Sequence, residues 1–352
     1  MTYHLQSIYE KIFTRPLDFP SPYDIKFLGI PGSQEGGAST FLGFGPRQDI
    51  PYLVIKLYRN SKYTPSVEQE ATILTLLQNS SLANFTPTLL LHGNAKHYPF
   101  LAQSVLPGSP LQVHLGADGL PDAHTAEQQF TLATQWLKDL AHVPLSSPIA
   151  GPSLTEQLDQ DYLIFKHLFN EISAIHLSQI SDQFTILKTL SSTRPYIQHT
   201  DFCRHNILLD RESLYVIDWS GAIVTPIPAQ DLFFFLTTYF LQIRTVHGME
   251  GFIDAFQKTW LQDNPFHQRT HYFVTQFFLE LNLDIAYFQS LFTYFLVKRS
   301  ILEYTLITEN AARWGLPRFT VSLALPYNLD YNSASKVQVW KVMLESFLSQ
   351  LS

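Results

Sequence analysis

The sequence predicts an α+β fold with two lobes, a small antiparallel sheet lobe followed by a larger, mainly helical lobe. A chain of 352 residues is too long for one ordinary compact core. Strand-like runs dominate before Pro107, and apolar residues at helical spacing dominate after it. Because strands and helices are segregated along the chain, we expect an N-terminal lobe over 1–106 and a C-terminal lobe over 107–352.

The N-terminal lobe is predicted to contain one sheet and one main helix. A Gly-rich turn over 31–38 and a loop over 45–51 separate the first strand-like runs. The helix has apolar residues on one side. The predicted strands are Asp24–Ile30, Ser39–Phe44, Pro51–Tyr58 and Tyr98–Leu106, and the predicted helix is Ser66–Leu77.

The C-terminal lobe is predicted to be helical over Thr125–Leu140, over Leu154–Leu177 and over much of the chain after Gln230. The most apolar stretch, Leu232–Ile243, is too short to cross a bilayer and includes polar residues. We therefore expect it to form a buried helix.

Composition excludes several classes of protein. An apolar fraction of 45% with 15% charged residues is not that of a disordered chain. The net charge of -7 argues against a nucleic-acid partner. A single cysteine, Cys203, excludes a disulfide framework and a thiolate zinc site, and it fits a reducing compartment. With no signal-like run over Met1–Phe13, we expect a cytoplasmic protein that does not bind membranes.

The segment 198–219 contains a possible metal site. If Asn206–Leu209 and Leu214–Asp218 are antiparallel strands, Asn206 lies opposite Asp218. Opposed residues in such a ladder lie about 5 Å apart at the backbone. Asp201 precedes the first strand and can project toward the same space. Two carboxylates and one amide favour Mg²⁺ over zinc as the bound ion.

Magnesium bound in this way usually also binds substrate phosphates, so we expect phosphate-binding groups in the upstream chain. Lys56 is a lone charge in an apolar run and requires an anion. Gly36 and Gly37 lie in a Gly-rich hairpin whose amides can approach phosphate oxygens. Glu70, on the predicted helix, can orient Lys56 by an ion pair, and Glu68 is the alternative partner.

The set Lys56, Glu70, His199-x-Asp201-x4-Asn206 and Ile217-Asp218-Trp219 resembles the aminoglycoside phosphotransferase and choline kinase family. These are small-molecule kinases with the protein-kinase fold. Phe100–Gly108 resembles the hinge of the family, and Pro228-x-x-Asp231-Leu232 resembles the segment after its metal-binding Asp. The resemblance covers about 25–239.

The resemblance implies a role for each matched residue. Asp201 is the expected catalytic base, and Asn206 and Asp218 are the expected Mg²⁺ ligands. Lys56, oriented by Glu70, is expected to contact the nucleotide phosphates. The remaining implied roles are structural support by His199 and Asp231 and adenine binding by the hinge from Gln103 to Val105. ATP is the implied co-substrate, with GTP left open, and catalysis is by positioning and charge stabilisation.

The loop departs from the family pattern at several positions. Thr200 and Phe202 stand where the family commonly has Gly and Leu. The sequence Cys203-Arg204-His205 replaces the more usual His-Pro-Gly. Arg204 either helps to neutralise the transferring group or faces solvent. Because no matched metal or base position is lost, we favour an active enzyme over a pseudokinase.

The acceptor pocket is expected to include carboxylates of 154–180, namely Glu156, Asp159 and Asp161. They would suit a cationic acceptor such as an amino sugar or amino alcohol. The alternative is that they form the solvated face of an amphipathic helix.

Three functions remain open. The first is ATP-dependent transfer of phosphate to a hydroxyl of a small metabolite, namely an amino sugar, a sugar or an amino alcohol. The second is a catalytically silent, nucleotide-binding regulatory protein. The third, a protein Ser/Thr kinase, is disfavoured because Trp219-Ser220 follows Asp218 in place of Phe-Gly and no Ala-Pro-Glu segment follows.

Overall fold

The computed structural model describes residues 26–30, 38–45, 49–145, 152–190, 194–241, 248–308 and 339–351, together with Leu5, Ile8 and Lys11. The chain forms two compact units. Unit 1 comprises 1–109 and 208–223, and unit 2 comprises 110–207 and 224–352. The segment 208–223 thus packs with the sheet unit, whereas the sequence analysis placed it in the C-terminal lobe. The predicted α+β class is confirmed, since the large sheet lies in unit 1 and most helices lie in unit 2.

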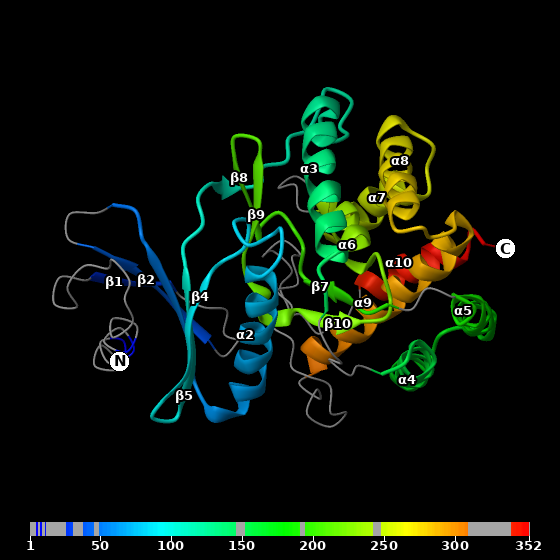
Figure 1. The fold of residues 1–352 in the computed structure, drawn as a ribbon. Coiled ribbons are helices and arrows are strands. Elements are labelled where there is room, and N and C mark those ends of the chain that lie inside the picture. Colours follow the sequence, from blue (N-terminus) through cyan, green and yellow to red (C-terminus); the bar gives the residue numbers. More distant parts are fainter. Residues whose placement is uncertain are drawn as a thin grey trace. The chain divides into compact units, whose positions relative to one another are not determined.

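Unit 1 is built on a five-stranded antiparallel sheet in the order β1-β2-β3-β5-β4 (Figure 1). The strands are β1 (Lys26–Ile30), β2 (Ala38–Phe44), β3 (Leu53–Tyr58), β4 (Leu89–Ala95) and β5 (Tyr98–Ser104). Strand β4 was not predicted, because His92-Gly93 is typical of a break between elements. In the structure β4 continues through both residues as an edge strand paired with β5.

The two faces of β3 have different surroundings because side chains alternate along a strand. Leu53, Ile55 and Leu57 pack into an apolar cluster with Phe41 and Phe100. After β3 the chain forms the short 3₁₀ helix η2 (Ser61–Tyr63) and then helix α2 (Thr64–Gln78). Lys56 lies on the opposite face of the strand, where it contacts Glu70 of α2. The lysine is therefore set against the α2 side of the sheet.

Unit 2 is mainly helical. Its helices are α3 (Ala123–Ala141), α4 (Leu154–Leu168), α5 (Ala174–Leu187), α6 (Gln230–Leu241), α7 (Gly248–Trp260), α8 (Pro265–Glu280), α9 (Phe288–Thr308) and α10 (Val339–Leu348), with η4 (Ile285–Tyr287) before α9. The single helix predicted over 154–177 is two helices, because Ser173 caps a new one by accepting a hydrogen bond from the His176 N–H.

Helix α6 is buried from Asp231 to Leu241, as expected for the most apolar stretch of the sequence. It packs against α7, α9 and α3. Over the described ranges no helix is both long and apolar enough to span a membrane.

Short strands flank the loops that carry the candidate site. β7 (Tyr196–Gln198) pairs with β10 (Ile223–Thr225), and β8 (Ile207–Asp210) pairs with β9 (Ser213–Val216) (Figure 1). The remaining elements are β6 (Ser109–Pro110) and the 3₁₀ helix η3 (Trp219–Gly221). The chain between β7 and β8 is the predicted catalytic loop, and the chain after β9 carries Asp218.

Candidate active site

Lys56 lies between two carboxylates in unit 1. Its Nζ is 2.7 Å from Glu70 Oε1 and 2.6 Å from Asp218 Oδ1. Glu70 is completely buried, and its other oxygen accepts a 3.4 Å hydrogen bond from the Tyr58 hydroxyl. The expected Lys56–Glu70 ion pair is therefore present, and Glu68 is exposed. Asp218 comes from a segment 162 residues away in the sequence.

Lys56 remains charged in this setting. Burial by itself lowers the pKa of the ammonium, but attraction to Asp218 and then to Glu70 outweighs burial, so the pKa is raised above its usual value. Only 8% of the residue is exposed. The charge is thus fixed at one position and has little competition from water.

Asp218 follows β9 and has left-handed backbone angles, with φ of 63° and ψ of 68°. Its side chain is 41% exposed, and Oδ1 also accepts a 2.9 Å hydrogen bond from the Ser220 hydroxyl. The predicted ladder does not extend to this residue. Strand β9 ends at Val216, and β8 begins only at Ile207, so Asn206 and Asp218 both lie outside the strands.

In unit 2, Asp231 at the start of α6 binds the backbone of the predicted catalytic loop. The Asp231 carboxylate accepts hydrogen bonds from the N–H of His199 at 2.5 Å and from the N–H of Thr200 at 2.7 Å. The Asp231 N–H donates in turn to the side-chain oxygen of Gln198 at 3.0 Å. These bonds tie the first turn of α6 to the chain leaving β7.

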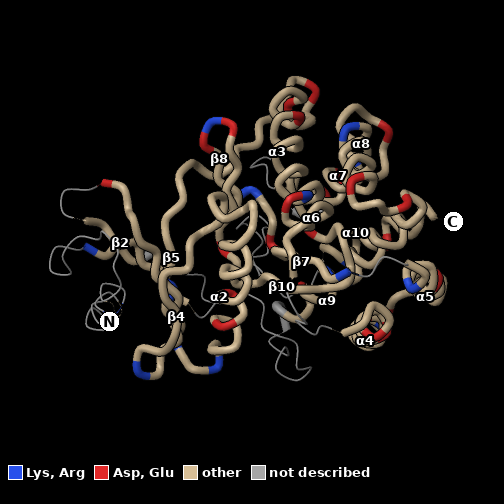
Figure 2. The backbone as a smooth tube through the Cα atoms, viewed as in Figure 1, with Lys and Arg blue, Asp and Glu red and all other residues tan. Residues whose placement is uncertain are grey.

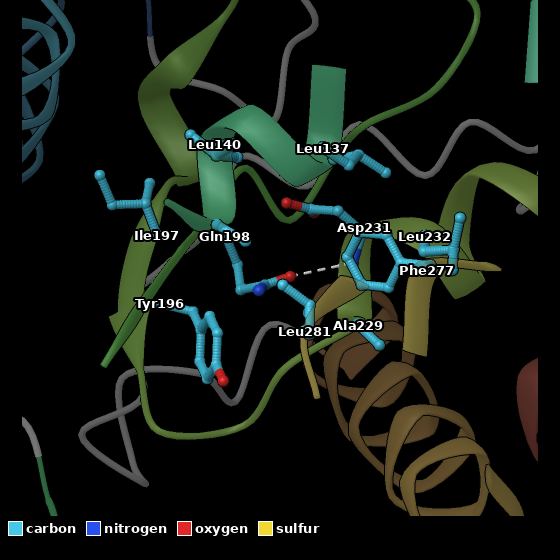
Figure 3. A pocket seen from close by; sticks show the side chains of 11 residues that line it. Leu137, Leu140, Tyr196, Ile197, Gln198, Ala229, Asp231, Leu232, Phe277 and Leu281 are labelled. Atoms are coloured by element: carbon cyan, nitrogen blue, oxygen red, sulfur yellow. Dashed lines mark hydrogen bonds between the residues drawn. The ribbon is translucent and has the colours of Figure 1, made fainter. Parts of the chain in front are cut away.

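Asp231 lines a small cavity whose other walls are mainly apolar (Figure 3). The lining residues are Leu137, Leu140, Ala141, Tyr196, Ile197, Gln198, Ala229, Leu232, Phe277 and Leu281. Burial raises the pKa of the Asp231 carboxyl to about 7, although the two backbone donors oppose the increase. The hydrogen bonds and the nearby Arg299 thus favour the ionised form, while burial favours the protonated form.

Asp201 and Asn206 are joined directly within the loop. The Asn206 Nδ2 donates to Asp201 Oδ2 at 2.8 Å and to the Asp201 carbonyl at 2.9 Å. Asp201 is 5% exposed and Asn206 is 8% exposed. Because the amide nitrogen makes both bonds, the amide oxygen of Asn206 is turned away from Asp201. Within the described ranges, this oxygen accepts no hydrogen bond from the protein.

The sequence analysis did not single out Arg299 on α9. Its Nη1 donates a 2.9 Å hydrogen bond to the carbonyl of Thr200 in the catalytic loop. Burial lowers the pKa of Arg299 to about 10, which leaves it charged at neutral pH, and Asp201 is among the nearby carboxylates that oppose the decrease. In the sequence Arg299 stands next to Lys298 in the aromatic-rich segment 288–308, so no isolated charge marked it as Lys56 was marked.

His199 is completely buried, and its Nδ1 lies 3.3 Å from the N–H of Asp201, which can donate to it. Cys203 is also fully buried. Its Sγ lies 3.8 Å from Asp201 Oδ1, and its N–H donates to the Asp201 carbonyl. The loop therefore surrounds Asp201 with its own polar groups.

The predicted nucleotide contacts of the hinge lie at the end of β5. Gln103 pairs with Val54 in the sheet, as Leu101 pairs with Lys56, so the Gln103 side chain is on the same face as Lys56. Its Oε1 is buried and has no hydrogen-bond partner in the described chain. Val105 follows β5 and is half-buried. Gly36 and Gly37 lie outside the described residues.

The three carboxylates expected near the acceptor have partners within unit 2. Glu156 closes the capping box at the start of α4 with Ser153. Asp159 pairs with Lys188 at 2.5 Å on the surface. Asp161 is buried and is bound by Lys298 at 2.8 Å and by the Tyr294 hydroxyl at 2.7 Å.

Acidic and basic residues are scattered along both units (Figure 2). In the part of the chain that is drawn, no helix or strand carries a continuous basic stripe. The charges that indicate a functional site are therefore the buried ones that lie close together within each unit.

Comparison with known proteins identifies the family. A family model described as the phosphotransferase enzyme family matches residues 47–266, well over half of the chain. The chain therefore belongs to this family of phosphotransferases. A search of curated proteins found no match.

Solved structures show the same fold at low sequence identity. A putative aminoglycoside phosphotransferase from Ralstonia eutropha JMP134 is similar with a TM-score of 0.60 and 11% identity, covering 99% of this chain and 98% of that one. Choline kinase from Cryptosporidium parvum Iowa II has a TM-score of 0.54 and 11% identity, covering 100% and 95%. Aminoglycoside phosphotransferase APH(4)-Ia has a TM-score of 0.54 and 12% identity, covering 100% of both chains.

The predicted kinase-like fold and family resemblance are both confirmed by these findings. The protein is accordingly a phosphotransferase by family.

Proposed function

We propose that this protein transfers the γ-phosphate of ATP, with Mg²⁺, to a hydroxyl group of a small metabolite. The acceptor class is an amino sugar, a sugar or an amino alcohol. The observation that carries the proposal is the contact of Lys56 with both Glu70 and Asp218. A buried lysine that joins a strand, a helix and a distant acidic segment is the arrangement expected of a phosphate-binding centre.

Lys56 is the proposed ligand of the nucleotide phosphates, and Glu70 orients it. Glu70 is fully buried and Lys56 has little freedom, so the ammonium does not reorganise when an anion arrives. The unpartnered Oε1 of Gln103, on the same face of the sheet, supports a contact with the nucleobase. Val105 and the glycines Gly36 and Gly37 complete the proposed nucleotide site. GTP remains an alternative donor.

Asn206 and Asp218 are the proposed Mg²⁺ ligands. Carboxylate and amide oxygens are the ligands that Mg²⁺ prefers. The chemistry of the two side chains fits, because the Asn206 oxygen accepts no hydrogen bond from the described chain and Asp218 is partly exposed. Bound Mg²⁺ would neutralise charge on the nucleotide phosphates.

Asp201 is the proposed base that orients and accepts the proton of the acceptor hydroxyl. Asn206 holds one of its carboxylate oxygens, and the N–H of Asp201 faces His199. The carboxylate therefore has a defined direction before the acceptor binds. His199 and Asp231 support the loop without contacting substrate.

The proposed acceptor site includes carboxylates of α4. Glu156, Asp159 and Asp161 were expected to attract a cationic acceptor, and each of them also has a partner within unit 2. Neutral sugars thus belong in the screen beside amino sugars and amino alcohols. A cytoplasmic location fits the single cysteine, whose thiol is buried.

The test is a Mg-ATP turnover screen over amino sugars, amino alcohols, sugars and nucleosides, measured as acceptor-dependent ADP release. We expect Asp201→Asn to abolish turnover while nucleotide affinity is kept. Asp218→Ala should weaken Mg-nucleotide binding as well. Asp182→Asn, an exposed position on α5, is the matched control and should retain full activity.

Full turnover by Asp201→Asn would contradict the assigned role. Nucleotide binding without ADP release on any acceptor would instead favour the second candidate, a silent nucleotide-binding regulatory protein.

A further inference from the structure

Thr200 has an unusual backbone conformation, with φ of 67°. A β-branched residue rarely adopts a positive φ, because its side chain then crowds the neighbouring peptide groups. The residue lies between His199 and Asp201, so its conformation determines the direction in which the Asp201 side chain leaves the loop. Such a conformation persists only where the surrounding structure holds it.

The backbone N–H and carbonyl of Thr200 are bound by side chains of two different helices. Its N–H donates to Asp231 Oδ1 at 2.7 Å, at the start of α6. Its carbonyl accepts a 2.9 Å hydrogen bond from Arg299 Nη1, on α9. The peptide groups on both sides of Thr200 are therefore bound to ionisable side chains, and the bond from the Arg299 guanidinium is stronger than a bond between neutral groups.

Arg299 is itself clamped between aromatic rings. Its guanidinium carbon lies 3.8 Å from the centre of the Phe234 ring and 5.3 Å from the centre of the Trp340 ring. Both distances are within the range of a cation–π interaction. Phe234 belongs to α6 and Trp340 to α10, so three helices converge on one side chain that is 4% exposed.

Helix α10 is also tied to α9 one turn beyond Arg299. The backbone N–H of Trp340 donates a 3.0 Å hydrogen bond to Glu303, which is 1% exposed. Glu303 and Arg299 are four residues apart on α9 and thus lie on the same face of the helix. The bond fixes Trp340 against the guanidinium, which links the C-terminal helix to the catalytic loop.

We propose that Arg299 is a positioning residue that holds the Thr200 carbonyl and so directs Asp201, and that α10 takes part by clamping the guanidinium. This inference rests on the proposed function, since it gives Arg299 a role only if Asp201 acts in catalysis. Arg299 binds the carbonyl of Thr200, which stands where the resembled family commonly has glycine, a residue that adopts a positive φ without strain.

The competing explanation is that Arg299 only neutralises buried carboxylates. Asp201, Glu303 and Asp231 are all near enough to stabilise its charge. Under that explanation any cation at this position would serve, and the effect of replacing it would not depend on Thr200. The two explanations can therefore be separated by a lysine variant and by a change at Thr200.

The first measurement is hydrogen–deuterium exchange of the amides of Asp201, Cys203 and Asn206 in the full chain. We expect Arg299→Met to speed exchange in this loop at least tenfold. Arg299→Lys keeps the charge and the fold but loses the planar donor group, and it should still speed loop exchange severalfold. Arg269→Met, on α8, breaks a surface ion pair with Glu127 on α3; it is the matched control and should leave the loop unchanged.

Unchanged loop exchange in Arg299→Lys would overturn the inference, whether or not Arg299→Met changes the exchange, and it would do so without any assay of activity. If Arg299→Met fails to fold, Arg299→Lys decides the question, because full protection of the loop by lysine means that charge alone is sufficient.

The second measurement is a double-mutant cycle with Thr200→Gly, using the best acceptor of the screen. We expect Arg299→Lys to lower kcat at least tenfold with little change in the KM for Mg-ATP. In the Thr200→Gly background the loss should be at least threefold smaller, because glycine holds the conformation without help. Equal losses in the two backgrounds would overturn the inference.

Failure of the proposed function has a different signature. It would appear as full turnover by Asp201→Asn, irrespective of the result at Arg299.

Discussion

The candidate residues of unit 1 and unit 2 are held in place in different ways. Lys56 is fixed by side chains alone, through contacts of 2.7 Å with Glu70 and 2.6 Å with Asp218. Asp201 lies in a loop whose backbone is fixed, with Asp231 on the N–H groups and Arg299 on a carbonyl. Opposite charges balance directly in unit 1, whereas in unit 2 buried charges are used to hold peptide groups.

The difference follows from the secondary structure at each position. Lys56 is in the middle of a paired strand, so the sheet already satisfies its backbone and only the ammonium needs partners. The catalytic loop has no ladder to satisfy its peptide groups, and buried peptide groups must find partners elsewhere. The comparison predicts that mutations in unit 1 act through uncompensated charge and that those in unit 2 act through loop order.

The largest expected effect is that of Lys56→Met on stability. It leaves the buried Glu70 without its cation, and breaking a buried pair in this way costs about 3–5 kcal/mol. We expect Lys56→Met/Glu70→Leu to recover much of the loss, since the buried charge is then removed. Chemical denaturation of the single and double variants measures both values.

The matched control is Lys188→Met, which breaks the exposed pair with Asp159 and should cost less than about 1 kcal/mol. A double variant at Lys56 and Glu70 that is as unstable as Lys56→Met would show that charge compensation does not hold unit 1 together.

An intermediate effect is expected for Asp231→Ala. It leaves the N–H groups of His199 and Thr200 without their acceptor, and an unsatisfied buried donor costs about 1–3 kcal/mol. The effect should be concentrated in the catalytic loop, which we expect to exchange its amides faster than the rest of unit 2. Hydrogen exchange and denaturation together measure the local and the global part.

Asp122→Ala is the comparison for Asp231→Ala, because Asp122 caps α3 by accepting from the N–H of Thr125. It should loosen only the start of α3. Loop protection unchanged in Asp231→Ala would show that the backbone of this loop is held by other contacts.

The smallest and most gradual effect is the dependence of stability on pH. Burial raises the pKa of Glu303 to about 7, from 4.5. The folded state therefore binds a proton more tightly than the unfolded state does, so the contribution of Glu303 is fully present below pH 4.5 and is lost as pH rises toward 7. Each unit of pKa difference corresponds to about 1.4 kcal/mol.

We expect the free energy of unfolding to fall between pH 5 and pH 7, and to fall less steeply in Glu303→Gln. Asp231 shifts in the same direction, so the variant should flatten the curve without abolishing its slope. Denaturation of both proteins across this range measures the difference. A variant with a steeper curve would mean that Glu303 is ionised in the folded state well below pH 7.

The class of fold, most of its strands and helices and the identity of the chemical groups could be predicted from the sequence. An isolated lysine in an apolar strand requires an anion wherever that strand is buried, so Lys56 and a nearby carboxylate could be predicted from local pattern. The strands β1, β2, β3 and β5 followed from apolar runs bounded by turn residues. The spacing of Asp201, Asn206 and Asp218 indicated oxygen ligation.

The contacts between these residues and groups far away in the sequence could not be predicted and follow from the tertiary structure. Nothing near Thr200 in the sequence signals that it adopts a positive φ or that Arg299, 99 residues away, binds its carbonyl. The predicted pairing of Asn206 with Asp218 in an antiparallel ladder is wrong, because β8 begins after Asn206 and β9 ends before Asp218. Local sequence predicts the backbone preference of a residue, whereas the contacts that override this preference depend on how helices far apart in the chain pack together.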